Sequence, residues 1–509
     1  MKKRAFISVF DKNNIVEFAK TLVEDYNFEI ISTGGTFKLL TENKIPAIEV
    51  SKITGFPEML SGKVKSLHPA IFGGILADIT NSKEEKELEK LNIKAFDMVV
   101  VNLYPFEKVA KSTDNIDEMV KNIDIGGCSL LRAGAKNYKN ITVISEISDY
   151  KKVLDELKNG KISEELRENL ALKAFNLTSD YDEIISKQLS KMFGKDENET
   201  KDFSFEKIQD LRYGENPHQK ASLYKAPKMA DYEILWGKEL SYNNIVDITG
   251  AVNIISEFFD VNAVAIVKHT TPCGVALGKD ITDAYKKAFD CDPISAFGGI
   301  IALTKPVNTE IAKLIHSVFV EVVIAPDFEE EALEILKAKK NIRLIKLKTP
   351  LKDYKKLLDD EIKITPFGAL VQEANTKDLD KDSFKVVTKA KPTKEQLEDA
   401  IFAWKVVKHA KSNAIVIARD FKTVAIGQGQ TNRVGAFEWA LDYACDESKE
   451  AVAASDGFFP AIDNIQAAAQ GRIGLIIQPG GSIKDKEVIA EADKYNIAMI
   501  TTGIRHFKH

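Results

Sequence analysis

Cysteine is scarce in this chain, and the chain has no long hydrophobic run. Four cysteines occur in 509 residues, far apart and with no C-x-x-C pair, which excludes a disulfide framework and a zinc site set by cysteine spacing. No uncharged apolar stretch approaches the roughly 18 residues that a membrane helix needs. The basic start, Met1–Arg4, precedes an apolar run that ends at Asp11, too short for an export signal. We therefore expect a cytoplasmic protein that does not bind membranes.

An excess of charge of one sign is also missing. The 71 Lys and Arg residues nearly balance the 76 Asp and Glu residues and leave a formal net charge of −5. This balance argues against a protein built mainly to bind nucleic acid, although it leaves room for a local basic pocket that holds a small phosphate. Hydrophobic residues make up 44% and charged residues 29% of the chain, an ordinary globular composition whose length predicts about two to four domains.

The N-terminal region alternates strand-like and helical patterns. Apolar residues recur at helical spacing from Ile15 to Val23, and Asp11 or Asn13 is placed to cap that helix. Four short apolar runs are typical of buried parallel strands: Phe6–Val9, Phe28–Ile31, Met98–Val101 and Ile141–Ile144. Strands separated by helices predict a doubly wound α/β domain that ends near residue 195.

A segment without apolar residues, Gly194–Asp202, is the expected linker between two domains, 1–195 and 203–509. The second region resumes the α/β alternation, and a charged stretch, Asn375–Ser383, is expected to divide it into two lobes. Its strand-like runs are Ala263–Val267, Ile300–Leu303, Val322–Ala325, Ala414–Ala418 and Leu475–Ile477. This pattern alone indicates two α/β regions but no reaction.

Two glycine-led segments of the first domain suit a phosphate. Thr33–Thr36 follows a predicted strand and opens a predicted helix, where glycines let backbone N–H groups approach an anion beside the positive helix end. A plain tight turn explains the same glycines equally well. Gly62–Pro69 adds Lys63, Lys65 and Ser66, although two lysines alone fit an ordinary solvated loop. Neither segment by itself decides between binding and structure.

Further polar residues follow the predicted strands of this domain. Asn102–Phe106 comes directly after a strand, at the sheet edge where α/β proteins bind ligands, and it contains Tyr104. Asp124 and Lys136 add an acid and another cation. Taken singly, Tyr104 fits a packing residue, Asp124 a cap and Lys136 a surface charge. The case for a site rests on their occurrence together with the glycine loop.

Lys268 and His269 have the most informative setting in the second region. Adjacent residues inside a strand face opposite ways, so both can act together only beyond the strand. Thr270–Gly274 is a turn signal that places the pair at the strand's carboxyl edge, although a structural histidine beside a solvated lysine remains an alternative. The zinc-deaminase motif needs Glu and Cys where the chain has Thr271 and Ala276, so a zinc site is not expected.

The chain resembles the bifunctional purine biosynthesis family, which combines aminoimidazole carboxamide ribonucleotide (AICAR) formyltransferase and inosinate (IMP) cyclohydrolase. The resemblance covers essentially the whole chain. The strings that carry it include Ser32–Thr36, Lys63–Pro69, Asn102–Phe106, Ile123–Gly127 and Leu211–Gln219. The resemblance implies a methylglyoxal-synthase-like fold for residues 1–195, the cyclohydrolase domain. It implies a larger, two-lobed, cytidine-deaminase-like α/β formyltransferase domain for residues 203–509.

For ring closure the resemblance implies catalytic roles for Lys65, Tyr104, Asp124 and Lys136. The carboxamide nitrogen of formyl-AICAR is a poor nucleophile, and a cation beside the formyl oxygen stabilises the developing oxyanion by about 3 kcal/mol per donor. We expect Lys65 to supply that cation, Asp124 and Tyr104 to move protons, and Lys136 to orient them. The implied nucleotide-binding residues are Ser8, Lys12, Thr33, Gly34, Gly35, Thr36, Lys63, Ser66, Ile125 and Gly126.

For formyl transfer the resemblance implies a catalytic group of Lys268, His269 and Asn413, in which His269 takes the proton of the weakly nucleophilic AICAR amine. The implied substrate contacts are Arg212, Tyr213, Gly298, Glu321, Phe458, Arg505 and Phe507. Glu321 departs from the pattern, because some members carry Asp there. The implied folate contacts are Phe297, Asn432, Arg433, Pro460, Asp463, Asn464 and His509.

The expected function is the last two steps of purine (IMP) biosynthesis. The co-substrate is 10-formyltetrahydrofolate, the partners are AICAR, formyl-AICAR and reduced folate, and no catalytic metal or nucleic acid is expected. The family implies a homodimer. In the alternative, the N-terminal domain is only a regulatory nucleotide-binding module and the transferase alone is active.

Overall fold

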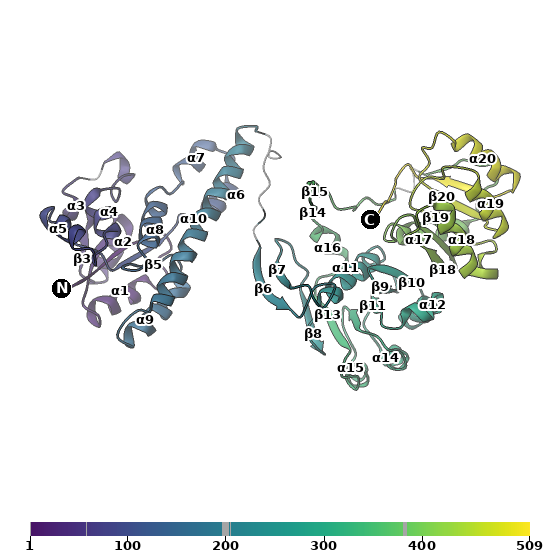
Figure 1. The fold of residues 1–509 in the computed structure, drawn as a ribbon, viewed down its shortest axis with the longest axis horizontal. Coiled ribbons are helices and arrows are strands. Elements are labelled where there is room, and N and C mark those ends of the chain that lie inside the picture. The colour runs from purple at the N-terminus through teal and green to yellow at the C-terminus, as the bar shows by residue number, and fades with distance from the viewer. Residues whose placement is uncertain (1, 58, 196–202, 204, 380–383) are drawn as a thin grey trace. The chain divides into compact units, whose positions relative to one another are not determined.

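The computed structural model describes residues 2–57, 59–195, 203, 205–379 and 384–509 (Figure 1). The chain divides into two compact units, Met1–Phe203 (unit 1) and Ser204–His509 (unit 2). Most of the expected linker, residues 196–202, lies outside the described residues. So do residues 380–383 of the charged stretch that is expected to divide the second region.

Unit 1 is built on a five-stranded parallel sheet in the order β3-β2-β1-β4-β5. The strands are β1 (Lys3–Val9), β2 (Phe28–Ser32), β3 (Ala47–Glu49), β4 (Met98–Asn102) and β5 (Thr142–Ile144). All four predicted strands of this region are confirmed. Each is buried because parallel strands are covered by the helices that connect them.

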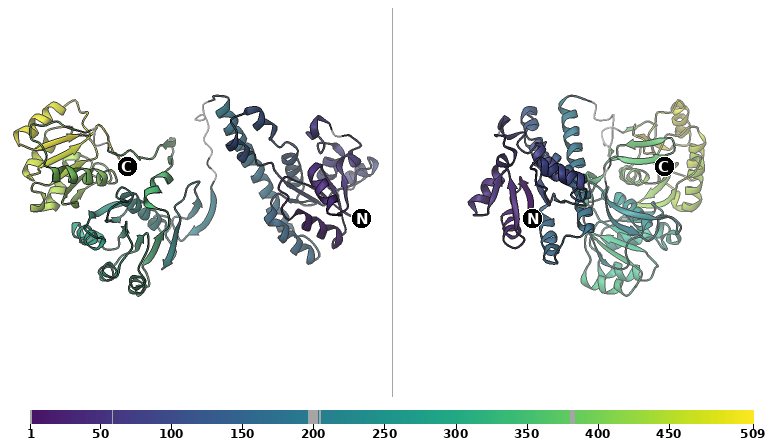
Figure 2. Two further views of the ribbon diagram at one scale, coloured as in Figure 1. Left: turned by 180° about the vertical axis from the view of Figure 1, so that it is seen from behind. Right: turned by 60° about the vertical axis from the view of Figure 1, so that its left-hand side comes forward.

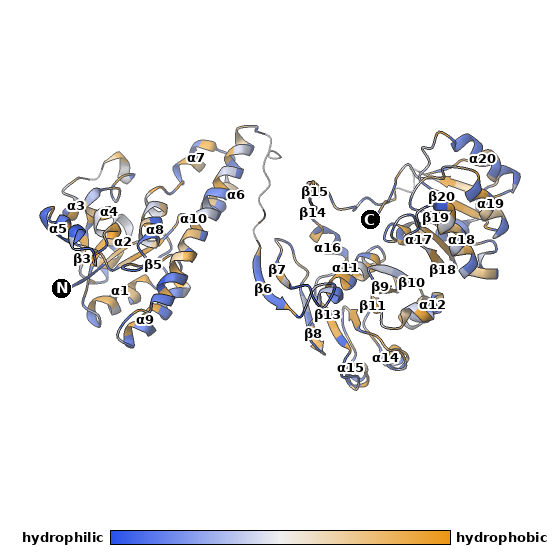
Figure 3. Cartoon of the chain, in the orientation of Figure 1, coloured by the Kyte–Doolittle hydropathy of each residue, from blue (hydrophilic) through white to orange (hydrophobic). Residues whose placement is uncertain are grey.

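The connecting segments of unit 1 are mainly helical. The helices are α1 (Ile15–Glu24), α2 (Gly34–Glu42), α3 (Val50–Thr54), α4 (Pro69–Leu76), α5 (Ser82–Lys90), α6 (Phe106–Ser112), α7 (Ile116–Lys121), α8 (Gly126–Lys136), α9 (Tyr150–Lys158) and α10 (Glu164–Met192). Short 3₁₀ turns cover η1 (Leu60–Gly62) and η2 (Ile147–Asp149). Figure 3 shows hydrophilic and hydrophobic residues on both α9 and α10, as expected for helices with one face on a core. The predicted cap of α1 is wrong: the N-cap is Asn14, whose side chain makes no capping bond.

The strand order of unit 1 reverses between β1 and β4. After β1 the chain adds β2 and β3 on one side of it; it then crosses back from β3 and adds β4 and β5 on the other side. Ser8 lies opposite Val101, and Val9 lies opposite Asn102, where both strands end. Such a reversal opens a crevice at the carboxyl ends of the strands, the usual ligand position in this class of sheet.

Unit 2 contains a mixed sheet of twelve strands in the order β16-β21-β20-β19-β17-β18-β10-β9-β11-β12-β13-β8. Two separate antiparallel pairs are β6–β7 and β14–β15. The bounds are β6 (Glu206–Leu211), β7 (Ala221–Lys225), β8 (Tyr232–Trp236), β9 (Ala263–Lys268), β10 (Thr271–Leu277), β11 (Ile300–Leu303), β12 (Val322–Ala325), β13 (Arg343–Leu347), β14 (Glu361–Thr365), β15 (Gly368–Gln372), β16 (Lys385–Val386), β17 (Ile415–Arg419), β18 (Lys422–Gly427), β19 (Val452–Ser455), β20 (Leu475–Gln478) and β21 (Ala498–Thr501). The five predicted strands of this region are confirmed.

The helices of unit 2 lie between these strands. They are α11 (Tyr242–Ser256), α12 (Ile281–Cys291), α13 (Pro293–Ala296), α14 (Thr309–His316), α15 (Glu330–Lys337), α16 (Leu351–Tyr354), α17 (Lys394–Val407), α18 (Arg433–Ala444), α19 (Asp463–Gln470) and α20 (Asp485–Lys494). Two 3₁₀ turns are η3 (Lys355–Leu357) and η4 (Cys445–Ser448).

The same topology occurs twice in unit 2, once in each lobe. In the first lobe, α11 leads into the antiparallel hairpin β9–β10, and β11, β12 and β13 then extend the sheet beyond β9. In the second lobe, α17 leads into the hairpin β17–β18, and β19, β20 and β21 extend the sheet beyond β17. The two sets meet where β10 pairs with β18, so the two expected lobes share one sheet (Figures 1 and 2). Helices α11 and α17 both contribute to one hydrophobic cluster that spans the lobes. The cytidine-deaminase likeness of these lobes stays a prediction.

Candidate active sites

A cradle of hydroxyl and amide groups lies at the crevice of unit 1. Ser8 Oγ and Thr33 Oγ1 are 2.8 Å apart, and Thr36 Oγ1 donates to the Val9 carbonyl at 3.0 Å. Gly34 starts α2 with a φ of +45°, a left-handed conformation that glycine adopts most readily. The first N–H groups of a helix have no partner within it, so the start of α2 offers donors to an anion.

Two lysines from distant segments reach this cradle. Lys12 Nζ donates to the Val9 carbonyl and to Thr36 Oγ1, the latter at 3.3 Å. Burial lowers the pKa of Lys12, an effect that Asp11 partly opposes. A Cβ atom added to Gly34 would lie 2.8 Å from Lys65 Nζ, so the Lys65 ammonium sits directly over the first residue of α2. Lys63 lies on the same segment as Lys65 and is exposed.

Asp124 is held just before α8, beside the cradle. Its Oδ1 accepts the Gly127 N–H at 2.7 Å, and its own N–H donates to Tyr181 Oη at 2.9 Å. Burial raises the pKa of Asp124. The backbone N–H groups of Gly127 and Tyr104 stabilise its charged form and so partly offset this rise. The Tyr104 side chain is half exposed and packs on Phe10 with ring centroids 4.9 Å apart.

The start of α8 packs closely on the lysine segment. A Cβ atom on Gly126 would lie 3.0 Å from the hydroxyl of Ser66, which is buried. The neighbouring Ile125 side chain is exposed. The structure therefore brings together the segments that carry Lys65 and Asp124, as the resemblance implies.

Asn102 orders this crevice, a role that the sequence analysis did not assign. Its Oδ1 accepts the N–H groups of Phe10 at 2.6 Å and Asp11 at 3.0 Å, and its Nδ2 donates to the Asp11 carbonyl at 3.0 Å. Asn102 thus ties the end of β4 to the loop after β1. The sequence feature that could have indicated this role is the position of Asn102 at the carboxyl end of a predicted strand, as the first residue of the Asn102–Phe106 motif.

Lys136 stands apart from this group. It lies in the last turn of α8, ten residues after Gly126, and is exposed. At 1.5 Å of rise per residue, this separation is about 15 Å along the helix. Because α8 begins at the crevice and leads away from it, the position of Lys136 does not support the predicted role in orienting Tyr104 and Asp124.

In unit 2, Lys268 and His269 lie at the end of a tight hairpin. Lys268 is the last residue of β9, and only His269 and Thr270 separate it from β10. Both loop residues have positive φ angles, 53° for His269 and 64° for Thr270. The turn therefore begins one residue earlier than the predicted signal. Lys268 Nζ donates to the Phe297 carbonyl at 2.8 Å.

A cavity of about 310 Å³ contains this pair. Its walls come from both lobes, and they include Lys268, His269, Asp292, Gln428, Gln430 and Tyr443. Cys273 also lines the cavity, and burial raises its pKa to about 12, so its thiol stays protonated at neutral pH. The cavity is a candidate reaction chamber for the Lys268–His269 pair.

Asn413 is fixed next to Gln430, which lines this cavity. Its backbone N–H and its Nδ2 donate to the Gln430 carbonyl at 3.1 and 2.9 Å, and its Oδ1 accepts from Arg433 Nη2 at 2.8 Å. Arg433 is buried and also binds Ser455 Oγ at 2.8 Å and the carboxylate of Asp456. Arg433, predicted as a folate contact, therefore acts in this structure on Asn413.

The C-terminal tail returns to the same place. Ser412 exchanges two hydrogen bonds with the backbone of Lys508, at 2.9 and 3.1 Å, and the His506 N–H donates to the Asp456 carbonyl at 3.0 Å. The Arg505 guanidinium lies 4.3 Å from the Phe507 ring centroid, which is 6.0 Å from that of His509. The predicted tail residues thus lie near Asn413.

The predicted folate residues of the second lobe lie in two segments, at the start of α18 and from Pro460 to the start of α19, besides His509 in the tail. Asn432 caps α18 by accepting the Gly435 N–H at 2.7 Å, and Asp463 Oδ1 accepts both the N–H and Nδ2 of Asn464 at 2.8 Å. Phe458 and Pro460 are exposed, whereas the intervening Phe459 belongs to the core.

The remaining predicted residues belong to the first lobe. Asn244 Nδ2 donates to Glu321 Oε2 at 2.8 Å. The Arg212 guanidinium lies 5.4 Å from the Tyr213 ring centroid. Phe297 packs on Phe319 with centroids 5.3 Å apart and precedes Gly298, whose φ is +74°.

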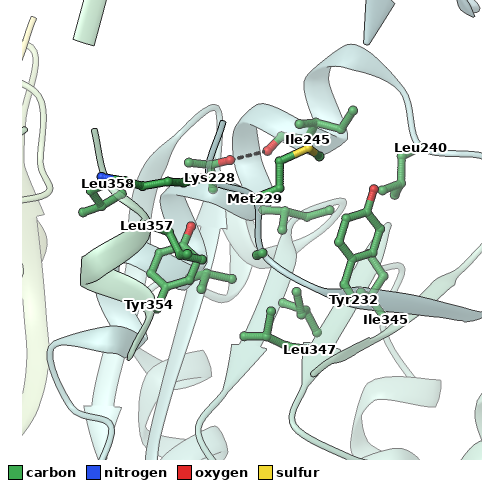
Figure 4. Close-up of a pocket in the computed structure, with 15 residues that line it drawn as sticks. Lys228, Met229, Tyr232, Leu240, Ile245, Ile345, Leu347, Tyr354, Leu357 and Leu358 are labelled. Atoms are coloured by element: carbon green, nitrogen blue, oxygen red, sulfur yellow. Dashed lines mark hydrogen bonds between the residues drawn. The ribbon is translucent and has the colours of Figure 1, made fainter. Parts of the chain in front are cut away.

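A second cavity in unit 2, of about 210 Å³, contains no predicted site residue. Figure 4 shows its mainly apolar lining, with Tyr232 and Tyr354 on opposite sides of the labelled group.

Among the residues that the structure describes, no cluster of three or more His, Cys, Asp or Glu side chains could hold a metal ion. Within the same residues, no helix combines the length and apolar character needed to cross a membrane.

Comparison with known proteins identifies the family. A family model described as "MGS-like domain" matches residues 14–129, and one described as "AICARFT/IMPCHase bienzyme" matches residues 134–443, more than half of the chain. The chain belongs to the AICARFT/IMPCHase bienzyme family. It is a bifunctional enzyme of purine biosynthesis, an AICAR formyltransferase and IMP cyclohydrolase. The expected N-terminal fold and larger C-terminal α/β domain are confirmed.

The relatives match the chain over its full length. It is 51% identical to the "Bifunctional purine biosynthesis protein PurH" of Thermoanaerobacter sp. (strain X514) and 49% identical to that of Bacillus mycoides (strain KBAB4), with all of each chain covered. A solved structure, "Crystal structure of ForH", is 29% identical and covers 37% of this chain and 100% of its own, with a TM-score of 0.33. The full-length relatives do not favour the alternative of a purely regulatory N-terminal domain.

Proposed function

We propose that the enzyme of the bienzyme family described here divides its two reactions between its units. Ring closure of formyl-AICAR to IMP takes place in residues 1–195, and formyl transfer to AICAR takes place in residues 203–509. The observation that carries the first assignment is the Lys65 ammonium over the start of α2, on the segment whose Ser66 hydroxyl packs against Gly126, two residues after Asp124. The second rests on the cavity that joins the Lys268–His269 pair to the Gln430 segment that binds Asn413.

In ring closure, the cradle binds the nucleotide phosphate and Lys65 polarises the formyl carbonyl. The carboxamide nitrogen attacks the formyl carbon, and the positive charge of Lys65 stabilises the oxyanion that forms. Asp124 accepts a proton from the attacking nitrogen, and the formamide nitrogen gives up a second as the C=N bond of the ring forms. Asp124 and Tyr104 pass these two protons to the formyl oxygen, which leaves as water. The buried setting of Asp124 suits this role, because burial raises its pKa and makes it a stronger base than an exposed carboxylate.

In formyl transfer, His269 takes the proton from the AICAR amine as the amine attacks the formyl carbon of 10-formyltetrahydrofolate. Lys268 and Asn413 stabilise the oxyanion, and Lys268 returns a proton to the departing folate nitrogen. Asn413 suits this role because Arg433 and Gln430 fix its amide and leave one Nδ2 hydrogen for the substrate. With ammonium and amide groups polarising the carbonyl, the mechanism assigns no step to a metal.

The remaining predicted residues keep their proposed ligands, with two exceptions. Arg433 becomes a positioning residue for Asn413, and Lys136 has no direct role in a single chain. The proposed nucleotide contacts of unit 1 are Ser8, Lys12, Thr33, Gly34, Gly35, Thr36, Lys63, Ser66, Ile125 and Gly126. The proposed AICAR contacts are Arg212, Tyr213, Gly298, Glu321, Phe458, Arg505 and Phe507. The proposed folate contacts are Phe297, Asn432, Pro460, Asp463, Asn464 and His509.

The proposal includes a homodimer in the cytoplasm. The hairpin β14–β15 pairs with no other named strand, and it exposes Ile364, Phe367 and Leu370, with Phe367 at 102% of its reference area. Exposed apolar side chains on a projecting hairpin support an interface with a second copy. The substrates are charged, water-soluble compounds, which suits an enzyme of the cytoplasm.

Two variants test the division of labour. His269→Ala is expected to lose formyl transfer and still cyclise supplied formyl-AICAR, whereas Lys65→Ala is expected to lose cyclisation and still consume formylated folate with AICAR. Each variant is the control for the other, because the unaffected reaction shows that the chain has folded. A His269→Ala enzyme that transfers formyl at the parent rate contradicts the assignment of unit 2. A Lys65→Ala enzyme that cyclises at the parent rate contradicts that of unit 1.

A further inference from the structure

The turn that carries His269 has an unfavourable sequence for its conformation. A two-residue hairpin loop with positive φ at both positions favours Asn-Gly or similar residues. Here the two positions are His269 and Thr270, with φ angles of 53° and 64°. Thr is β-branched and disfavours the left-handed region strongly. A loop of this sequence keeps its shape only where its surroundings hold it.

Helix α11 provides those surroundings through Asp247. The Asp247 Oδ1 accepts the Thr270 N–H at 2.6 Å, and the neighbouring His269 N–H also stabilises the carboxylate. One turn later, Gly250 lets the helix backbone approach, since a Cβ atom there would lie 3.2 Å from the Thr270 carbonyl oxygen. One turn earlier, Asn244 holds Glu321. The three residues are spaced by three and so share one face of α11.

The second lobe contains the same arrangement, a helix carboxylate bound to the backbone of a hairpin turn, at the equivalent position. Asp399 is the sixth residue of α17, as Asp247 is of α11. Its carboxylate accepts the N–H groups of Asp420 at 2.9 Å and Phe421 at 2.8 Å. These residues form the β17–β18 turn, again with positive φ angles, 52° and 55°. The second turn carries no residue of the proposed site, so it provides an internal comparison.

We propose that Asp247 is a positioning residue for formyl transfer, which holds the His269–Thr270 turn in its left-handed conformation and thereby places the His269 side chain in the cavity. The inference rests on the proposed role of His269. Asp247 acts through His269 and touches neither substrate. Asp399 performs the same structural task in the second lobe without serving the reaction.

A double-mutant cycle in the full chain tests this. Asp247→Ala is expected to lower kcat for formyl transfer about ten-fold or more, because small displacements of a reacting group are costly, while KM for AICAR stays within about three-fold. Asp247→Asn, which keeps one acceptor, is expected to lose less. If Asp247 acts through His269, the variant lacking both side chains is no slower than His269→Ala alone. Cyclisation of supplied formyl-AICAR stays at the parent rate in every variant.

Asp399→Ala is the matched control. It removes the same two hydrogen bonds from the other turn and is expected to lower the thermal midpoint comparably while transfer stays within about two-fold of the parent. The proposal is overturned if Asp247→Ala and Asp247→Asn both transfer within two-fold of the parent. It is also overturned if their loss multiplies with that of His269→Ala, or if Asp399→Ala lowers kcat equally. Formyl transfer at the parent rate by His269→Ala would instead contradict the proposed role of His269 itself.

Discussion

Arg433 holds Asn413 through a 2.8 Å hydrogen bond from Nη2 to Oδ1, while its other terminal nitrogen binds the buried carboxylate of Asp456. The bond decides which way the Asn413 amide faces, because Oδ1 must accept from Arg433 and Nδ2 must then donate. Asp456 also accepts the Ala414 N–H at 3.1 Å. One buried ion pair thus sets both the backbone and the side chain of the proposed catalytic amide.

Arg433→Met is expected to abolish formyl transfer and to destabilise unit 2 by about 3–5 kcal/mol, because it leaves Asp456 buried and unpaired. Arg433→Lys keeps a charge for Asp456 but lacks the fork that reaches Asn413 as well, so it should retain more stability and still lose transfer. All three tryptophans lie in unit 2, so their fluorescence during urea unfolding measures this stability separately. Transfer at the parent rate by Arg433→Lys would show that Asn413 needs no such anchor.

Local patterns were enough to predict the strands of both units. Nine short apolar runs predicted nine strands, because parallel and central strands are buried on both faces and their sequences are continuously apolar. The sequence predicted a turn after β9 but not the second strand, β10, that makes it a hairpin. His269 and Thr270 give no sequence signal for a left-handed loop, since the carboxylate that holds it lies 22 residues earlier, in α11.

The site was predictable only as a set of motifs. Family motifs supplied Lys65, Asp124 and His269, but the positioning residues depend on tertiary contacts that no local pattern shows. Asn102 and Asp247 each bind backbone groups of a distant loop. Arg433 lies in a motif that resembles a folate-binding segment, and only its burial against Asp456 shows that it faces inwards.

Gly34→Ala tests the cradle of unit 1. An added methyl group would lie 2.8 Å from Lys65 Nζ and would occupy a backbone with a φ of +45°. The variant should lose cyclisation about ten-fold or more, because the ammonium is displaced from the formyl oxygen. Gly55→Ala is the control: its φ is +66°, but nothing lies within 4 Å of the added atom. Both substitutions carry the backbone strain, so a selective loss of cyclisation, measured by absorbance on formyl-AICAR, points to a disturbed Lys65 or phosphate cradle at Gly34 rather than to strain alone.

Asp124→Asn separates activity from stability in unit 1. Burial raises the pKa of Asp124, so the folded state binds its proton more tightly than the unfolded state, and ionisation costs stability as pH rises through that pKa. The amide has no such cost and keeps an acceptor for the Gly127 N–H. The variant should therefore lose cyclisation and yet gain stability at neutral pH, with the gain fading as pH falls through the raised pKa and absent below the ordinary Asp value, about pH 4. Hydrogen exchange of the peptides that cover β1 and β4 measures the stability of unit 1. A loss of protection in the variant at neutral pH contradicts the expected gain in stability.

Glu257→Gln tests a buried charge cluster that joins α11 to α17. Lys408 Nζ and Lys355 Nζ bind the two carboxylate oxygens at 2.9 and 2.8 Å, and His409 Nε2 lies 3.3 Å from the first. Burial alone would raise the pKa of Glu257, but the hydrogen bond from His409 and the charges of His409 and Lys408 hold it well below its usual range. The carboxylate therefore stabilises the folded state wherever the unfolded chain would also be ionised.

The glutamine variant should destabilise unit 2 by about 3–5 kcal/mol at neutral pH, because buried Lys408 is left with only the exposed Asp378 carboxylate, 3.8 Å away, as a counter-charge. A depressed carboxyl pKa contributes stability above the unfolded value and loses it as pH falls, so the difference should shrink only below about pH 4.3. Glu334→Gln, which breaks an exposed pair with Lys337 at 3.1 Å, should cost under about 1 kcal/mol at any pH. Urea unfolding followed by tryptophan fluorescence at pH 7 and at about pH 3, well below the unfolded Glu pKa, measures both variants. A Glu257→Gln deficit that stays constant between these pH values would mean that packing, rather than the charge of Glu257, holds α11 and α17 together.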